Sequence, residues 1–283
     1  MRKSVLITGS SGYIGQHLSK HLKDDYDVYG LDMVEKPENQ ELKGFLLENI
    51  TVDRRPWEFK YFKLPTFYNC VVHLAADVRV NESMTYPSKY IKTNINGLYN
   101  TFRFVDTGCF IFASTGAAEN PTSVYALTKR LGEEMVNEYA FNKGIPYTLF
   151  RFYNVIGSDG IMPTNTDGLM YNLMNAPEIG SFNLYGNDFN TPDGSAIRDY
   201  IHVNEICESI RKAIEKPSSE IENLGTGTGY TVKQMVETFK RVNNVNFDVV
   251  EMDRRPADPE KIVLNNVSKF YKQEYTIDEM LKV

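Results

Sequence analysis

Residues 5–15 read Val-Leu-Ile-Thr-Gly-Ser-Ser-Gly-Tyr-Ile-Gly. The apolar residues at the start predict a buried parallel strand, and the glycines follow it at a G-x-x-G-x-x-G spacing. Gly9 permits the tight turn from strand to helix, Gly12 lets the backbone approach a pyrophosphate, and Gly15 lets the helix pack on the sheet. The helix expected at about residues 12–22 offers its positive end to phosphate. A glycine-rich turn without a ligand is the alternative, which the order of strand, loop and helix disfavours.

A second run, residues 27–32, predicts the next strand and places Asp32 at its carboxyl end. In dinucleotide-binding folds an acidic residue at this place binds the ribose 2′-hydroxyl. A carboxylate there repels a 2′-phosphate, so we expect NAD rather than NADP as the cofactor. A solvated loop aspartate is the alternative interpretation.

Tyr125 and Lys129 form a Tyr-x-x-x-Lys pair further along the chain. This spacing puts both side chains on one face of a helix. A lysine ammonium beside a phenol stabilises the phenolate, so Tyr125 is a candidate base near neutral pH. Such pairs are common by chance. The glycine loop upstream is what favours a catalytic interpretation of this pair.

The apolar runs along the first half of the chain alternate with helical patterns. Further strands are expected at residues 70–75, 109–114 and 147–153, and helices at about 87–105 and 124–142. This alternation predicts an α/β fold with a doubly wound parallel sheet, whose right-handed crossovers put helices on both faces. A ligand should bind at the carboxyl ends of the strands.

The composition changes after about residue 155. Residues 157–194 are rich in Gly, Asn, Asp, Pro and Thr and predict a loop-rich lobe. We expect a Rossmann-type domain over residues 1–155, to which a segment at about 195–225 returns, and a smaller C-terminal lobe over 156–283. The elements expected in this half are helices at about 167–174, 204–215 and 231–242 and a strand at 246–251.

The overall composition indicates a globular enzyme-sized chain, with 283 residues, a net charge of −6 and 42% hydrophobic residues. No apolar stretch approaches the roughly 18–20 residues of a membrane-spanning helix, and the first apolar run is too short for a signal peptide. No basic block stands out, which argues against nucleic acid or an anionic membrane as the main partner. Cys70, Cys109 and Cys207 are expected to be free thiols in a reducing cytoplasm.

His17 and His21 stand four residues apart in the first helix, a spacing that can hold zinc. No third ligand presents itself nearby in the sequence. Solvated helix residues are therefore the better account, and no metal site is expected.

Several short motifs and one long signature extend over the chain. They are Thr8-Gly9-x-x-Gly12-Tyr13-Ile14-Gly15, His73-Leu74-Ala75-Ala76, Asn94-x-Asn96-Gly97, Ser114-Thr115, Tyr125-x-x-x-Lys129, Arg151-Phe152-Tyr153-Asn154 and Arg254-Arg255-Pro-Ala-Asp258. The long signature, residues 184–203, reads Leu-Tyr-Gly-Asn-Asp-Phe-x-Thr-Pro-Asp-Gly-x-x-x-Arg-Asp-Tyr-Ile-His-Val. Together they resemble the extended short-chain dehydrogenase/reductase family, and within it most closely the UDP-galactose (UDP-glucose) 4-epimerases. The similarity runs nearly end to end.

The resemblance implies NAD-dependent inversion at C4 of a UDP-hexose through a 4-keto intermediate. Tyr125 would remove the proton of the C4 hydroxyl, and Lys129 would lower the pKa of Tyr125 and bind the nicotinamide ribose. Thr115 would relay the proton, with Ser114 as the second choice. The cofactor contacts implied are Gly9, Gly12, Tyr13, Ile14, Gly15, Asp32, Met33, Asn49, Ile50, Leu74, Ala75, Ala76, Asn94, Tyr125, Lys129 and Tyr153.

The resemblance also makes the C-terminal lobe the main binding region for the UDP-sugar. Arg198 and Arg255 suit the pyrophosphate because guanidinium forks bind phosphate oxygens in pairs, although each could instead be a surface charge. Asp258 would accept from the uridine ribose, and Tyr185 would pack on the uracil. The substrate-binding residues implied are Asn154, Leu169, Tyr185, Arg198, Arg255 and Asp258. The family also implies a homodimer through the helices at about 87–105 and 124–142.

The chain departs from the family pattern beside the expected site. Thr115 and Tyr125 are only ten positions apart, and the segment between Asp32 and Asn49 is also short. Val78 stands where galactose epimerases often have a lysine. The residue at position 78 leaves the sugar open between UDP-glucose/UDP-galactose and the N-acetyl forms, and the short loops predict a more open active site.

Two other kinds of function stay open. A 4,6-dehydratase usually carries Asp-Glu after the threonine, where this chain has Gly116-Ala117. A decarboxylase or reductase of the same family has no such simple sequence test. A catalytically idle NAD-binding protein is the alternative of a different class, which the intact Thr115, Tyr125 and Lys129 disfavour.

Overall fold

The computed structural model describes residues 2–47, 50, 65–255 and 258–283. The chain forms two compact units. Unit 1 is Met1–Arg151 with Cys207–Glu222, and unit 2 is Phe152–Ile206 with Asn223–Val283.

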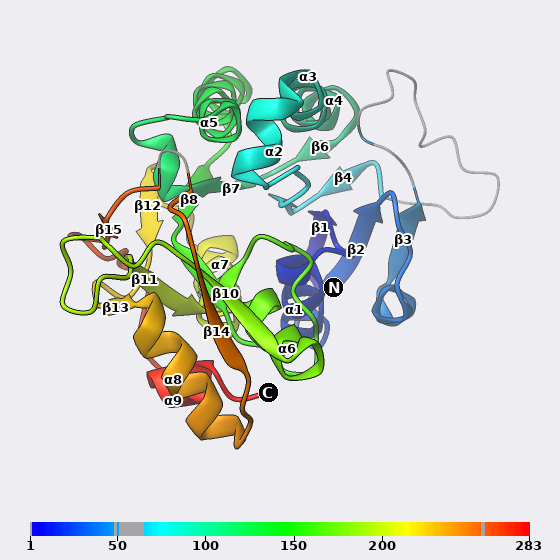
Figure 1. Cartoon of the computed structure of the whole chain (residues 1–283). Coiled ribbons are helices and arrows are strands. Elements are labelled where there is room, and N and C mark those ends of the chain that lie inside the picture. Colours follow the sequence, from blue (N-terminus) through cyan, green and yellow to red (C-terminus); the bar gives the residue numbers. More distant parts are fainter. Residues whose placement is uncertain (1, 48–49, 51–64, 256–257) are drawn as a thin grey trace. The chain divides into compact units, whose positions relative to one another are not determined.

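The first half of the chain alternates short strands and helices (Figure 1). Its elements are β1 Ser4–Thr8, α1 Tyr13–Leu22, β2 Asp27–Asp32, η1 Pro37–Glu41, β3 Gly44–Leu47, β4 Phe67–Tyr68, β5 Cys70–His73, α2 Val80–Thr85, α3 Pro87–Tyr90, η2 Ile91–Asn96, α4 Gly97–Phe104, β6 Asp106–Thr107, β7 Phe110–Thr115, η3 Gly116–Ala118, α5 Val124–Lys143 and β8 Tyr147–Phe152. Those that follow are β9 Asn154–Ile156, α6 Leu169–Ile179, β10 Ser181–Tyr185, β11 Ile197–His202, α7 Val203–Glu215, β12 Ile221–Leu224, β13 Gly229–Thr231, α8 Val232–Asn243, β14 Asp248–Met252, β15 Lys261–Ile262 and α9 Ile277–Met280.

A seven-stranded sheet in the order β12-β8-β7-β5-β1-β2-β3 confirms the predicted doubly wound α/β fold. β1 pairs in parallel with β2 on one side and with β5 on the other, so the strand order reverses beside β1. In Figure 1, α4 and α5 lie on one side of this sheet and α1 on the other. Such a reversal is where open α/β sheets bind ligands, at the carboxyl ends of the strands.

The central strands are apolar along their whole length because both faces of the sheet are covered. Val5, Ile7, Val71 and Val72 are fully buried, and every residue of β5 is buried. Two-sided burial removes the alternation of apolar and polar residues that a half-exposed strand shows. The apolar runs were therefore a reliable sign of these strands.

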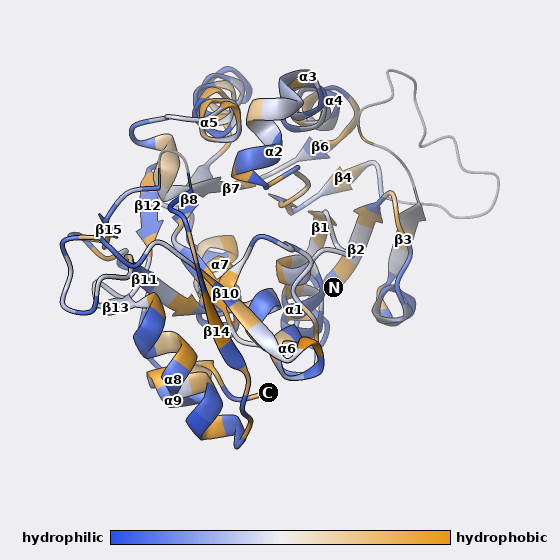
Figure 2. Ribbon diagram, viewed as in Figure 1, coloured by the Kyte–Doolittle hydropathy of each residue, from blue (hydrophilic) through white to orange (hydrophobic). Residues whose placement is uncertain are grey.

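Unit 2 is built on smaller sheets, one of β10 with β14 and one of β13, β11 and β15 with β9 beside β11. Its core includes Phe182 of β10, Tyr200 of β11 and Phe239 of α8. Figure 2 shows hydrophobic and hydrophilic residues alternating along α8, as expected of a helix with one buried face. The helices expected at about 167–174 and 231–242 and the strand at 246–251 are present with shifted ends.

The helix predicted at about 87–105 is present as α3, the π-helical turn η2 and α4 in direct succession. Two other local features differ from the expectation. The short segment after Asp32 contains η1 and the edge strand β3. β3 pairs in parallel with β2, which the sequence did not indicate. His17 is buried with its ring edge-on to Tyr13, so it is not a solvated helix residue.

The described helices include none that is long and apolar enough to cross a membrane. The described residues contain no group of three or more His, Cys, Asp or Glu side chains placed to hold a metal ion.

Candidate active site

The glycine loop between β1 and α1 is shaped by three close backbone approaches. Gly9 has a φ of +75°, and a Cβ there would lie 2.7 Å from the amide nitrogen of Ala75. A Cβ on Gly15 would lie 2.1 Å from the Gly9 carbonyl oxygen, so the helix could not sit this close with any other residue. A Cβ on Gly12 would meet only the Gly9 carbonyl oxygen among the described atoms, at 3.1 Å. The loop therefore leaves room beside Gly12 and the start of α1, which suits the pyrophosphate of a dinucleotide.

Asp32 ends β2 next to this loop. Its carboxylate accepts the backbone N–H groups of Ser11 at 3.0 Å and Val34 at 3.1 Å. Burial raises the pKa of Asp32, and these backbone hydrogen bonds lower it. The carboxylate is thus fixed beside the glycine loop, where a ribose hydroxyl could donate to it. Met33, which follows, is exposed.

The resemblance also implies Asn49 and Ile50 as contacts of the adenine. Ile50 packs its side chain on α4, where a Cβ on Gly97 would lie 2.6 Å from Ile50 Cδ1. The Ile50 carbonyl accepts a hydrogen bond from Asn100 Nδ2 at 2.7 Å. Asn49 lies outside the described residues.

The segment after β5 lies against the glycine loop. The Leu74 N–H donates to the Thr8 carbonyl at 3.0 Å, and the Ala75 N–H to the Thr8 hydroxyl at 3.3 Å. Ala75 and Ala76 are both half-buried. The small side chains here let the segment approach the loop closely, as a site for the cofactor requires.

The side chain of Asn94, in η2, hydrogen-bonds to other residues of the protein. Its amide group exchanges hydrogen bonds with the backbone of Asp77 at 2.9 and 3.0 Å and donates to the Thr128 hydroxyl at 3.0 Å. The structure therefore places Asn94 between the segment after β5 and α5. These contacts are made from within the π-helical turn η2.

Tyr125 stands in the first turn of α5, one residue after the helix begins. The Ser123 hydroxyl caps this end by accepting the Ala126 N–H at 3.2 Å. The Thr115 hydroxyl hydrogen-bonds the phenol of Tyr125 and lowers its pKa, whereas burial raises that pKa to about 12. The side chains implied as base and relay are thus in contact.

Lys129 lies one helix turn after Tyr125 and is 3% exposed. Its Nζ donates to the Ala113 carbonyl at 2.8 Å and lies 5.0 Å from the ring centre of Phe112. Burial lowers the pKa of Lys129 to about 7, and the charge of Glu133 acts in the opposite direction. At neutral pH this amine is therefore close to the balance between its charged and neutral forms.

Sequence reasoning missed Ser83, which holds the same turn from outside. Its hydroxyl accepts the Tyr125 N–H at 3.1 Å and donates to the Val80 carbonyl at 2.6 Å. N–H groups in the first turn of a helix have no partner within the helix, so Ser83 satisfies one that carries the candidate base. The partners are 42 residues apart, and no spacing rule indicates such a bond.

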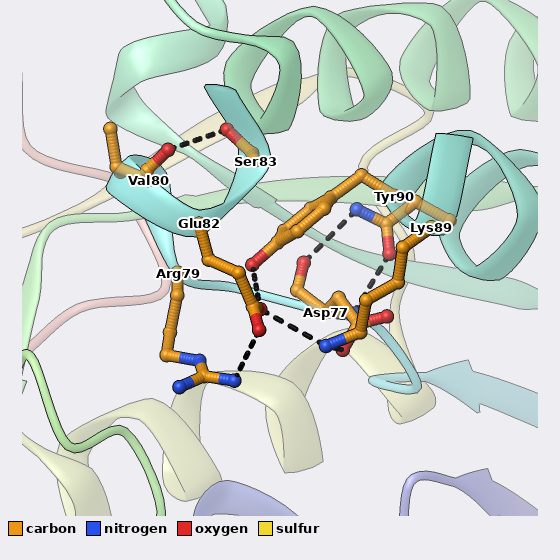
Figure 3. A network of polar contacts seen from close by, with 8 residues as sticks. Asp77, Arg79, Val80, Glu82, Ser83, Lys89 and Tyr90 are labelled. Carbon is orange, nitrogen blue, oxygen red and sulfur yellow. Dashed lines mark hydrogen bonds and ion pairs between the residues drawn. The ribbon is translucent and has the colours of Figure 1, made fainter. Parts of the chain in front are cut away.

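A charged network stands beside Ser83 (Figure 3). The Glu82 carboxylate accepts from Arg79 at 2.7 Å, from Lys89 at 3.0 Å and from the Tyr90 hydroxyl at 2.7 Å. Lys89 also pairs with Asp77 at 3.4 Å. The network ties the segment after β5 to α2 and α3.

Unit 2 brings four of the implied nucleotide-binding residues together in pairs. The guanidinium of Arg198 meets the carboxylate of Asp258 at 2.5 Å, and the Arg198 side chain is 10% exposed. The guanidinium of Arg255 lies 4.0 Å from the ring centre of Tyr185.

The other implied contacts of unit 2 have structural partners as well. Asn154 donates from Nδ2 to the Asp199 carbonyl at 3.0 Å. The Tyr153 N–H donates to the Leu224 carbonyl at 3.0 Å. Leu169 begins α6 and packs against the core of unit 2.

Comparisons with known proteins bear on the family to which the chain belongs. The model of the "NAD dependent epimerase/dehydratase family" matches residues 5–225. UDP-glucose 4-epimerase 2 of Arabidopsis thaliana is 29% identical over 93% of this chain and 87% of that protein. A protein of the same plant named for UDP-arabinose 4-epimerisation is 29% identical over 90% of this chain and 68% of its own.

Among solved structures, UDP-glucose 4-epimerase from Brucella ovis in complex with NAD is 26% identical, with a TM-score of 0.88. The match covers 99% of this chain and 96% of that one. The family model spans most of the chain and includes the glycine loop and the Tyr125–Lys129 pair. The chain therefore belongs to the NAD dependent epimerase/dehydratase family.

Proposed function

We propose that the protein is an NAD-dependent nucleotide-sugar 4-epimerase that inverts C4 of a UDP-sugar. The observation that carries the proposal is the end of β7 against α5, where the Thr115 hydroxyl meets the phenol of Tyr125 and Lys129 stands one turn away. Its relatives named as UDP-glucose and UDP-arabinose 4-epimerases support the same reaction class.

The cofactor fits the residues present in unit 1. Gly9, Gly12 and Gly15 shape the turn for the pyrophosphate, and Asp32 offers a fixed carboxylate to the adenosine ribose. When bound, NAD⁺ takes a hydride from the sugar carbon and returns it to the opposite face, so no net oxidation results.

Tyr125 acts in this proposal as the base for the C4 hydroxyl. With a pKa of about 12 in the protein alone, it holds its proton at neutral pH. A positive charge nearby stabilises the phenolate, and the cationic form of Lys129 supplies one such charge. Thr115 donates a hydrogen bond to the same oxygen and can pass the proton on.

The nucleotide part of the substrate is assigned to unit 2. Arg198 and Arg255 neutralise the pyrophosphate, and Asp258 accepts from the uridine ribose. The guanidinium of Arg255 already covers one face of the Tyr185 ring, so the uracil packs on the other. Asn154 and Leu169 complete the assigned contacts.

Incubation with four candidate substrates, followed by proton NMR of the products, tests the function. UDP-glucose, UDP-GlcNAc and UDP-arabinose should reveal which sugar is inverted at C4, and UDP-glucuronate tests for decarboxylation. If none of the four UDP-sugars is inverted at C4, the proposed function is wrong. Tight NAD binding without turnover would instead favour an idle NAD-binding protein.

Homodimerisation through α4 and α5 is part of the proposal. Leu127 and Leu131 lie four residues apart on α5 and are exposed, as is Tyr99 on α4. An exposed apolar stripe of this kind suits a helix–helix interface. Leu131→Glu should convert dimer to monomer in light scattering, and a wild-type monomer at micromolar concentration would contradict it.

The reducing cytoplasm remains our proposal for the compartment. Cys70, Cys109 and Cys207 are free and buried, which supports it because an oxidising compartment favours disulfides.

A further inference from the structure

A buried ion pair lies one helix turn beyond Lys129, on residues that the proposed mechanism does not use. Glu133 of α5 is 2% exposed and Arg151 of β8 is 6% exposed. Arg151 donates from Nε and Nη2 to the two Glu133 carboxylate oxygens, both at 2.8 Å. The Ser114 hydroxyl donates to the same carboxylate at 2.5 Å. Glu133 therefore joins α5 to both β7 and β8 by charge-assisted bonds.

The end of β7 makes three of the contacts that hold the candidate catalytic face of α5. Its last three residues each contact the helix: the Ala113 carbonyl accepts from Lys129, Ser114 donates to Glu133, and Thr115 meets Tyr125. A slip of the helix along the strand would break these three contacts together. Glu133 is thus part of what sets the position of the phenol.

Glu133 also supplies negative charge to a buried region that otherwise holds cations. The titratable groups that interact electrostatically with Lys129 in the described chain are Glu133 on its own helix and His73 on β5, and Glu133 in turn pairs with Arg151 on β8. Burial and the charge of Lys129 lower the pKa of His73 to about 3, so His73 is neutral at pH 7. Without Glu133, Lys129 would lose the negative charge that raises its pKa, and Arg151 would lose the carboxylate that both of its nitrogens contact.

We propose that Glu133 is a positioning residue, which fixes α5 on β7 through Ser114 and on β8 through Arg151 and keeps Lys129 in its cationic form one helix turn from Tyr125. Its consequence for catalysis rests on the proposed function, but its effect on Lys129 does not. The competing account is an ion pair that only stabilises the fold. Buried pairs of that kind can often be replaced without a change in the chemistry nearby.

The first test measures the Lys129 amine directly. Lysine labelled with ¹³C at Cε is titrated by NMR in the protein without substrate, and Lys129→Met assigns the signal. Glu133→Gln should lower the pKa of Lys129 by about one unit or more, because the only described carboxylate facing it is lost. The matched control is Glu134→Gln, the next residue on α5, which is exposed and pairs with Arg130 at 3.0 Å. An unchanged pKa in folded Glu133→Gln would overturn the proposal.

A double variant keeps the test decisive if Glu133→Gln does not fold. Glu133→Gln with Arg151→Met removes both charges of the pair, so the guanidinium is not left buried without the Glu133 carboxylate. The pKa of Lys129 should still fall, since Glu133 is the charge that raises it. A merely structural pair predicts a wild-type titration in this variant, and that result would overturn the proposal.

The second test uses the pH profile of epimerisation. With Lys129 losing its proton at lower pH, the alkaline limb of kcat in Glu133→Gln should move to lower pH by the same shift that NMR shows. Glu133→Asp, which keeps the charge, should restore the limb. A profile that is scaled down without moving would contradict the proposal. If wild type inverts no UDP-sugar, the proposed function fails while the NMR titration still decides the role of Glu133.

Discussion

The candidate catalytic groups of unit 1 and the candidate nucleotide groups of unit 2 are held in opposite ways. Lys129 is buried and Tyr125 is half-buried, and burial shifts the pKa of each away from its charged form. In unit 2, Arg198 meets a carboxylate at 2.5 Å and Arg255 lies on an aromatic ring. The charged forms of Tyr125 and Lys129 are therefore disfavoured by burial. The charges of Arg198 and Arg255 already have partners within the protein.

This difference matches what each region has to do. A base must change its protonation state during a reaction. Burial brings the pKa of Lys129 toward neutrality but moves that of Tyr125 away from it, so the phenol needs a nearby positive charge to ionise. A nucleotide site must bind and release a charged ligand, so its cations need partners that the phosphates can replace or join. Four substitutions separate these accounts.

The largest effect should come from Tyr125→Phe. Loss of the base should lower kcat by roughly 10²–10⁴-fold, with little change in NAD binding. The measurement is C4 inversion by NMR, with fluorescence or calorimetry for the cofactor. Tyr139→Phe on the same helix is the control, since its ring stacking on Phe102 is retained. If Tyr125→Phe keeps an activity within tenfold of the wild type, Tyr125 is not the base.

Arg198→Met should weaken UDP binding by roughly tenfold to a hundredfold, the size expected when a charged hydrogen-bonding partner is lost. The effect should appear in KM and in the calorimetric Kd of UDP, while kcat changes less. Arg254→Met, which removes an exposed arginine of the same unit, should change UDP affinity much less. Equal losses in both variants would mean that Arg198 acts by net charge alone.

Lys129→Met should stabilise the fold while abolishing activity. Burial lowers the pKa of Lys129 from 10.5 to about 7, so the folded state binds this proton less tightly than the unfolded chain. The cost of the charged amine is therefore full below pH 7 and fades as the pH rises toward 10.5. Removing it should gain on the order of 2 kcal/mol at pH 6, and less at pH 9.

Thermal unfolding of the wild type and the variant at both pH values measures this gain. Lys143→Met, at the exposed end of the same helix, should show no such pH dependence. A Tm of Lys129→Met below that of the wild type at pH 6 would show that the buried amine is a net stabiliser.

The smallest effect should come from Ser83→Ala, which leaves the Tyr125 N–H without its acceptor. Loss of a helix-end partner should cost about 1 kcal/mol of stability and reduce kcat severalfold by loosening the first turn of α5. Chemical denaturation and steady-state kinetics measure both. Ser88→Ala, an exposed serine on α3, is the control. A wild-type kcat in Ser83→Ala would show that the other contacts of α5 suffice.

The sequence predicted much of unit 1 and less of unit 2. The strands of unit 1 are buried on both faces, so their apolar runs were recognisable without the structure. In unit 2, β10 and β11 flank polar turns within a segment rich in Gly, Asn and Asp, and their short mixed patterns gave no comparable sign. The π-helical turn η2 was also not predictable, because the side chain of Asn94 meets partners on other elements.

The sequence by itself determined the features whose physics is local. Gly9, Gly12 and Gly15 define a phosphate loop by their spacing, and Tyr125 and Lys129 share a helix face because they are one turn apart. Tertiary structure alone decided which groups meet across long separations: Ser83 with Tyr125, Arg198 with Asp258, and Glu133 with Arg151. Tertiary structure also decided the shifted pKa values, since desolvation depends on how many atoms the whole fold packs around a side chain, and no stretch of sequence specifies that.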